Sequence, residues 1–136
     1  MSYKNGNMKT IELHENGLDI QFRIRENGVV ELADFSSQEV KKAVMEPKED
    51  ICYPAVEIHR SGTGSLNMHA YKNNINQSSV DFVYENHELK AQAGGKELEI
   101  VMVSPEKLKA VYQMRLLDGV PAVQTWTVII NEGSEV

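Results

Sequence analysis

The fold is decided by the stretch Glu15-Asn16-Gly17-Leu18-Asp19-Ile20-Gln21-Phe22-Arg23-Ile24-Arg25-Glu26-Asn27-Gly28. Between its two Asn-Gly pairs, apolar and polar side chains alternate one by one, which is the period of a β-strand and not of a helix. Asn-Gly supplies the positive φ angles of a type I′ turn, so both pairs predict tight turns between antiparallel strands. The alternation therefore predicts a sheet with one apolar face and one wet face.

Further segments of alternating or β-branched residues follow in the second half, at 97–103, 108–116 and 122–130. Their similar spacing is typical of a β-meander. Helix signals are confined to one window, 37–46, which begins with a capping serine and ends before a proline. The sequence thus predicts an all-β fold with at most one short helix. Because the strands follow one another as hairpins, an antiparallel β-sandwich is favoured over a closed barrel.

Trp126 is the single tryptophan of the chain. An aromatic side chain on an exposed sheet face stacks on sugar rings, as it does in carbohydrate-binding modules, whereas one on the inner face packs into the core. Trp126 shares its parity in the strand pattern with Val128 and Ile130. The alternation therefore predicts that Trp126 belongs to the core.

The length of 136 residues predicts a single domain, residues 1–136, or one piece of a larger protein. The net charge of −6 and the scattered basic residues argue against nucleic acid as a partner. No apolar stretch resembles a signal peptide or is long enough to cross a membrane. Cys52 has no second cysteine to pair with, which fits a reducing compartment. We therefore expect a soluble, cytoplasmic chain with no membrane partner.

No arrangement of side chains in the sequence predicts a catalytic or metal-binding site. The four histidines are far apart, and none has the spacing to a cysteine or a second histidine that would hold zinc. The Gly62-Thr63-Gly64-Ser65 stretch lacks the features of a nucleophile elbow and of a phosphate-binding loop. Glu97 and Glu99 are interpreted as a solvated sheet face. The residues alone thus predict no catalytic residue, no metal site and no cofactor.

A family resemblance is carried by an ordered series of segments: Tyr53-Pro54-Ala55-Val56-Glu57-Ile58, then Asp81-Phe82-Val83-Tyr84-Glu85-Asn86-His87-Glu88-Leu89, then Ala122-Val123-Gln124-Thr125-Trp126-Thr127-Val128-Ile129-Ile130-Asn131-Glu132-Gly133. Their order resembles the N-terminal domain of glycoside hydrolase family 36, the α-galactosidase or melibiase family. Members of that family carry a Pro-Ala strand, a Phe-x-Tyr-x-x-His strand and a Trp strand that ends in Asn-x-Gly. The residues before Tyr53 fit only as opening hairpins.

The resemblance implies part of a β-supersandwich, of the kind also found in galactose mutarotases, placed before a (β/α) barrel that hydrolyses α-galactosides. The catalytic aspartates of the family lie on that barrel, which this sequence does not contain. Residues 1–136 are therefore expected to be a non-catalytic N-terminal fragment of a larger glycoside hydrolase. The implied partners are the catalytic barrel of the parent chain, further copies in a homo-oligomer, and the α-galactoside bound by the parent enzyme.

Asp50 and Cys52 are the residues for which the resemblance implies a place beside the substrate. In the family, a loop before the Pro-Ala strand reaches toward a substrate pocket and carries Asp-Tyr-Arg. Here the loop contains Asp50-Ile51-Cys52, so the aspartate matches and the arginine does not. A thiol lacks the planar fork with which a guanidinium holds hydroxyl groups.

The alternative interpretation of the whole chain is a stand-alone carbohydrate-binding or protein-interaction module.

Overall fold

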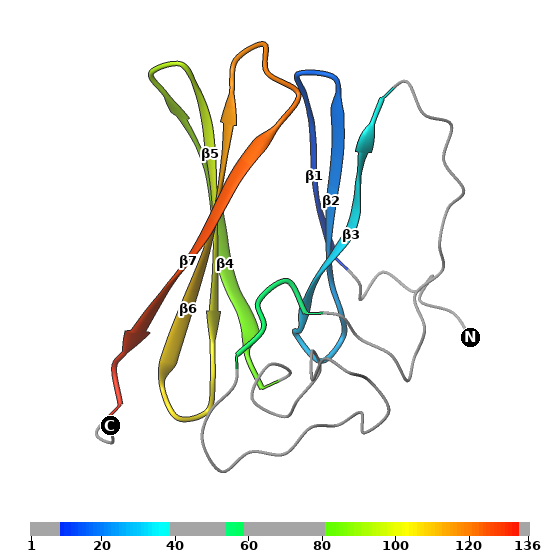
Figure 1. The fold of residues 1–136 in the computed structure, drawn as a ribbon. Helices are drawn as coiled ribbons and strands as arrows, with labels where there is room; N and C mark the ends of the chain where they lie inside the picture. Colours follow the sequence, from blue (N-terminus) through cyan, green and yellow to red (C-terminus); the bar gives the residue numbers. More distant parts are fainter. Residues whose placement is uncertain (1–8, 39–53, 59–80, 134–136) are drawn as a thin grey trace, which may run out of the picture.

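The computed structural model describes residues 9–38, 54–58 and 81–133, and these form a sandwich of two antiparallel sheets (Figure 1). The smaller sheet has the strand order β1-β2-β3, and the larger has the order β4-β5-β6-β7. Within each sheet, every strand pairs with its neighbour in sequence, as the hairpin pattern predicted. The bounds are β1 Lys9–Glu15, β2 Leu18–Ile24, β3 Val30–Ser37, β4 Val83–Gln92, β5 Gly95–Val103, β6 Leu108–Leu117 and β7 Val123–Asn131.

The prediction of an all-β antiparallel sandwich is confirmed, and no helix occurs within the described ranges. Of the window considered for a helix, Ser37 is the last residue of β3 and Gln38 lies in a turn, while residues 39–46 fall outside the described part. No helix among the described residues is long and apolar enough to cross a membrane.

The core lies between the two sheets and is built from the alternating rows that the sequence displays. The apolar row of β2 is fully buried against the inner rows of β5 and β6. Phe22, with an exposed fraction of 0%, meets Tyr112 edge-on, with ring centroids 5.5 Å apart. Burial of the Tyr112 ring also raises the pKa of its phenol above 10.0, against a smaller opposing effect of the hydrogen bond with Thr125. Burial of each such large side chain stabilises the fold by about 1.5–3 kcal/mol.

The two Asn-Gly pairs form different turns, although they have the same sequence. Asn16 and Gly17 both have positive φ, at 55° and 81°, which confirms the predicted two-residue type I′ turn. At the second pair only Gly28 has positive φ, at 90°. Gly28 N–H donates to the Arg25 carbonyl and Arg25 N–H donates to that of Val29, so this loop is one residue longer. The prediction of a type I′ turn at Asn27-Gly28 was therefore wrong.

Contacts at both ends hold the two sheets together. At one end, Asn16 donates to the Leu117 carbonyl and accepts from Gly119 N–H, each at 2.9 Å, and Lys96 pairs with Glu15. At the other end, Tyr84 N–H donates to the Gly28 carbonyl at 2.7 Å. Each set of contacts joins a hairpin turn of the smaller sheet to a strand or turn of the larger one.

Position 28 requires glycine for two reasons: its φ is positive, and Val83 leaves no room for a Cβ. Substitution to alanine tests this. A Cβ at Gly28 would lie 2.8 Å from Cβ of Val83, whereas a Cβ at Gly94, which also has positive φ, meets no atom within 4 Å. Gly94→Ala is expected to cost about 1 kcal/mol from the backbone angle alone. Gly28→Ala is expected to cost at least about 1 kcal/mol more, because Val83 must move. Urea unfolding of the two variants measures the difference, and equal losses would contradict the close packing.

A buried ion pair lies beside the Gly28 loop. Arg25 donates from Nε and Nη2 to the two carboxylate oxygens of Glu31, at 2.8 and 2.9 Å, and both side chains are buried. The backbone of Glu31 also forms an isolated β-bridge to Pro54, and Ala55 N–H donates to the Val30 carbonyl. The predicted Pro-Ala strand is thus reduced to a single bridge in the described residues 54–58.

Candidate functional site

The two residues expected beside a substrate, Asp50 and Cys52, lie outside the described residues. The same holds for His59 and His69. The nearest described position is Pro54, which is held against Glu31 at the edge of β3. The chain that follows the predicted loop is therefore anchored to the smaller sheet.

Trp126 lies on the outer face of the larger sheet, so the prediction that it belongs to the core was wrong. The inner face is fixed by the buried residues of β6, where Met114 pairs with Thr125 of β7. Trp126 is the neighbour of Thr125 and therefore points to the opposite side. Its side chain is half-buried. Thr125, Thr127 and Ile129 therefore lie on the inner face of β7, and Trp126 lies on its outer face.

Three side chains on this outer face form the Trp126 cluster, which we define as Glu97, Arg115 and Trp126. The register places Glu97 of β5 directly opposite Arg115 of β6. Arg115 donates to Oε2 of Glu97 from Nη2 at 3.1 Å and from Nε at 3.4 Å. Its guanidinium carbon lies 5.3 Å from the centroid of the Trp126 ring, within the range of a cation–π contact. The cluster therefore aligns an acceptor, a planar donor and an aromatic ring across neighbouring strands.

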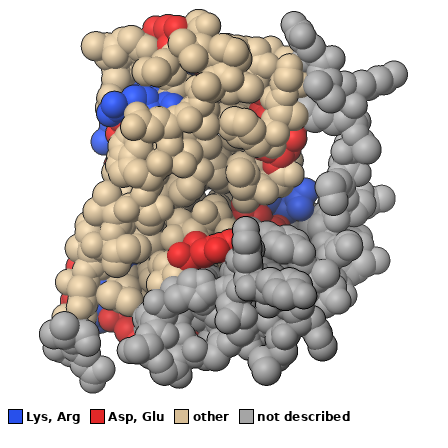
Figure 2. Space-filling view, viewed as in Figure 1, with Lys and Arg blue, Asp and Glu red and all other residues tan. Residues whose placement is uncertain are grey.

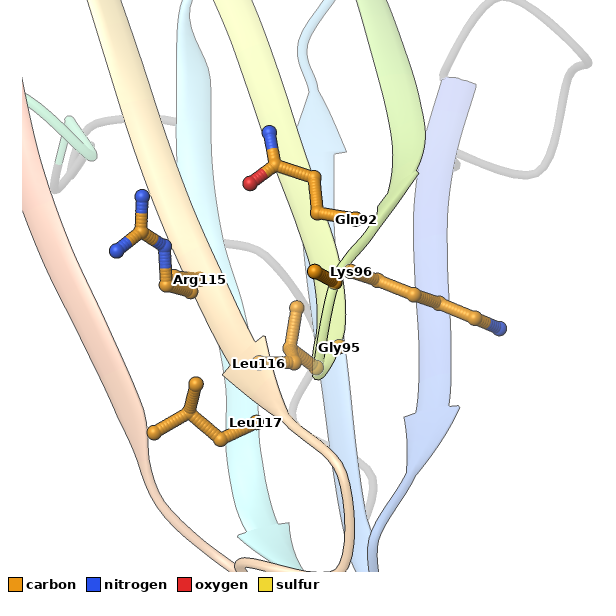
Figure 3. Close-up of a pocket in the computed structure, with 7 residues that line it drawn as sticks. Gln92, Gly95, Lys96, Arg115, Leu116 and Leu117 are labelled. Carbon is orange, nitrogen blue, oxygen red and sulfur yellow. The ribbon is translucent and has the colours of Figure 1, made fainter.

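A hollow with a volume of about 220 Å³ adjoins the cluster at the end of the sheet. Arg115 lines one side of it, and Lys96 leaves the other side and points toward β1 (Figure 3). The remaining wall of the hollow is formed by Gln92, Ala93, Gly95, Leu116 and Leu117. An amide, a guanidinium and a nearby indole suit a neutral polar ligand, such as a sugar, better than they suit bond cleavage. Sequence reasoning missed this group because its members are brought together only by strand register.

Tyr84 and His87 form a second polar pair, at the start of β4. The Tyr84 hydroxyl and Nδ1 of His87 are hydrogen-bonded at 2.8 Å. Strict alternation would place residues three apart on opposite faces, but the register shifts between Tyr84 and Asn86, so Glu85 is an extra residue. Phe82, by contrast, is buried in the core. The Phe-x-Tyr-x-x-His segment thus supplies one core residue and one exposed pair.

His14 forms an exposed pair with Asp19 across the first hairpin. Its Nδ1–H donates to Oδ1 of Asp19 at 2.7 Å, and this hydrogen bond, with the charges of Asp19 and Glu12, raises the pKa of His14 above 6.5. The pair therefore stabilises the folded chain below pH 6.5, and this contribution is lost as the pH rises through the raised pKa.

We expect Asp19→Asn to lower the pKa of His14 in an NMR titration. An unchanged titration would show that Asp19 does not hold the ring.

Comparisons with known proteins agree with this fold. No protein-family model and no curated protein matches the chain. A solved structure of the α-galactosidase AgaA of Geobacillus stearothermophilus, of glycoside hydrolase family 36, is similar with a TM-score of 0.56 and 13% identity, over 93% of this chain and 23% of that chain.

Two further structures of that enzyme are similar as well. A variant in complex with raffinose matches with a TM-score of 0.55 and 12% identity, over 92% of this chain and 22% of that chain. A variant in complex with 1-deoxygalactonojirimycin matches with a TM-score of 0.56 and 13% identity, over 93% of this chain and 23% of that chain. The chain spans less than a quarter of that enzyme. The resemblance predicted from the sequence is confirmed as one of fold: this chain folds as one part of a family 36 α-galactosidase does.

Proposed function

We propose that this chain is the non-catalytic N-terminal β-sandwich part of an α-galactosidase-like glycoside hydrolase, in which it supports a catalytic barrel. The observation that carries the proposal is the shared fold with a family 36 enzyme over 93% of this chain. The order of the Phe82, Tyr84 and Trp126 segments in the sequence is in keeping with the same family. We place the parent protein in the cytoplasm, in keeping with the single Cys52.

The titratable side chains of the larger sheet are consistent with a supporting role. Glu97 accepts both hydrogen bonds of Arg115, and Lys109 lies between Glu85 and Glu132 at 3.9 and 3.4 Å. Glycoside hydrolysis requires two carboxyl groups that face each other across the sugar, about 5–10 Å apart, with one free to donate a proton. Carboxylates paired with cations on an open sheet face do not provide that arrangement. In the parent enzyme, Asp50 and Cys52 are proposed to lie at the rim of the pocket that the barrel forms.

An assay with an aryl α-galactoside tests the non-catalytic role. The purified chain is expected to release no aryl alcohol above the buffer rate, because both reacting carboxylates belong to the barrel. Turnover that co-purifies with the chain and persists in independent preparations would contradict the proposal.

Reading the gene beyond the codon for Val136 tests the link to a barrel. The expected frame continues into alternating β and α segments, and a stop codon at that point would contradict it.

The Trp126 cluster favours one alternative, a carbohydrate-binding module. Its half-buried indole and adjoining hollow are of the kind that such modules present to sugars. Calorimetry with galactose and raffinose separates the two functions. A supporting domain is expected to bind neither sugar measurably. A micromolar dissociation constant that Trp126→Ala abolishes, and that Phe35→Ala leaves unchanged, would favour the binding module.

A further inference from the structure

Asn16 joins the two sheets through both polar atoms of its side-chain amide. Nδ2 of Asn16 donates to the Leu117 carbonyl at 2.9 Å, and Oδ1 accepts from Gly119 N–H at 2.9 Å. Leu117 ends β6 and Gly119 lies in the turn after it, so the contact joins the β1–β2 turn to the β6–β7 turn. The amide nitrogen therefore supplies one half of this contact, and the amide oxygen supplies the other half.

Asn16 is followed by Gly17, and Asn-Gly is the dipeptide in which asparagine loses its amide nitrogen most readily. The backbone nitrogen of the glycine attacks Cγ of the asparagine, the Cγ–Nδ2 bond breaks, and Nδ2 leaves as ammonia with the proton that the glycine nitrogen gives up. Water then opens the succinimide ring to aspartate or isoaspartate. Glycine favours the attack because it has no Cβ to hinder the approach. The same dipeptide occurs at Asn27-Gly28 and, outside the described residues, at Asn5-Gly6.

The loss of the amide nitrogen has different consequences at Asn16 and at Asn27. At Asn27 the described contact uses the oxygen, because Oδ1 accepts from Val29 N–H at 3.1 Å. An aspartate at that position still accepts this bond. At Asn16 the nitrogen that leaves is the donor to the Leu117 carbonyl. A carboxylate has no hydrogen to donate, so its oxygen and the Leu117 oxygen repel each other at this separation.

The β1–β2 turn is a place at which the sandwich can open locally. It lies at one end of the molecule, beside the β6–β7 turn (Figure 1), and Figure 2 shows this upper end as mostly uncharged surface. Gly17, whose nitrogen is the attacking atom, is exposed. Turns at the ends of sheets open at a lower free energy than the core does. Since two hydrogen bonds hold the Asn16 amide in place, the reaction proceeds from the open turn and is slower than in the unfolded chain.

We infer that Asn16 is a deamidation site, and that its conversion to aspartate or isoaspartate releases the β1–β2 turn from the larger sheet. The released turn does not form the contact again, because the donor has left as ammonia. Isoaspartate also lengthens the backbone of a two-residue type I′ turn, whose geometry fixes the register of β1 and β2. The same reaction at Asn27 leaves the two sheets joined. This inference does not rest on the proposed function.

Amide hydrogen exchange of two aspartate variants tests the consequence of the reaction. Asn16→Asp reproduces the product, and Asn27→Asp is the matched control in the same dipeptide. In Asn16→Asp the Gly119 amide loses its partner as the turn is released, and it is expected to exchange about tenfold faster than in the wild type, the effect of one lost hydrogen bond. In Asn27→Asp its rate is expected to be unchanged. Ile100, in the middle of β5, is expected to stay protected in both variants, which shows that they are folded.

Ageing of the wild-type chain tests the reaction itself. After incubation in mildly alkaline buffer, peptide mapping by mass spectrometry is expected to find aspartate and isoaspartate at position 16, formed more slowly than in urea. The aged fraction is expected to show the same faster exchange at Gly119 as Asn16→Asp does. Gly17→Ala is the control: a Cβ at Gly17 meets no atom within 4 Å, so the contact of Asn16 is kept, while the Cβ hinders the attack on Cγ. Position 16 is expected to remain asparagine much longer in this variant.

Several results would overturn the inference. These are a position 16 that stays asparagine in the folded chain after the chain in urea has fully converted, a Gly119 amide that exchanges at the wild-type rate in Asn16→Asp or in the aged fraction, and an equal change at Gly119 in Asn27→Asp. Ageing of Gly17→Ala at the wild-type rate would show that the nitrogen of residue 17 is not the attacking atom, and would likewise overturn it. None of these results bears on the assay for α-galactoside hydrolysis.

Discussion

Phe22→Ala is expected to destabilise the chain by about 3–5 kcal/mol, the typical cost of emptying a buried phenylalanine site. Phe22 is fully buried at the centre of the sandwich, where its ring meets Tyr112 edge-on. The truncation removes the apolar burial and the ring contact together, and leaves a cavity between the two sheets. Domains of this size have a free energy of unfolding of about 5–15 kcal/mol, so a large part of the total is removed. Urea unfolding followed by far-ultraviolet circular dichroism measures the loss.

Phe35→Ala is the matched control for this prediction. Phe35 lies on β3, next to β2 in the same sheet, but 45% of it is exposed. The same chemical truncation is expected there to cost about 1 kcal/mol or less. If the two variants lost equal stability, the core would not be centred on Phe22.

Glu31→Gln is expected to cost about 3–5 kcal/mol, because it leaves the buried Arg25 guanidinium without its carboxylate. Glu31 accepts two hydrogen bonds from Arg25 and lies 3.9 Å from Arg23, so its carboxylate faces two cations. Arg25→Met is expected to cost less than Glu31→Gln, because Arg23 remains to compensate Glu31. Thermal unfolding of both variants measures the order of the two effects.

Two further variants test how the cost depends on the burial of the arginine that is left unpaired. The double variant Arg25→Met with Glu31→Leu is expected to recover most of the loss, since replacing both charges by apolar groups removes the unpaired ion. Glu97→Gln is expected to cost less than Glu31→Gln, about 1 kcal/mol, because the Arg115 side chain that loses its carboxylate is 42% exposed and water solvates it. A loss as large at Glu97 as at Glu31 would contradict the role assigned to burial.

The hairpin order of the fold was predictable because each signal was local. The period of two between Gly17 and Glu26 identified β2, and the buried row found in the structure is the one the pattern predicted. Turn type was not predictable from the dipeptide. Asn16-Gly17 and Asn27-Gly28 have the same sequence, but the pairing of Arg25 with Val29 adds a residue to the second loop. That pairing depends on strand register, which a dipeptide does not encode.

The face of β7 was not predictable from alternation alone. A period of two separates the row of Trp126 from the row of Thr125, but both rows contain apolar residues. Which of them faces the other sheet is decided by the pairing of Thr125 with the buried Met114. The Trp126 cluster was missed for the same reason. Glu97, Arg115 and Trp126 meet only through the register of successive strands, and no short motif joins them.

The position of Trp126 gives the chain a built-in optical probe. It is the single indole of the protein, and it lies half in contact with water beside the Arg115 guanidinium. Indole emission shifts to shorter wavelength when water is excluded from the ring. The emission maximum therefore reports on the last strand alone and not on the core, so spectra recorded during unfolding or titration can reveal local detachment of this strand before the rest of the sandwich opens.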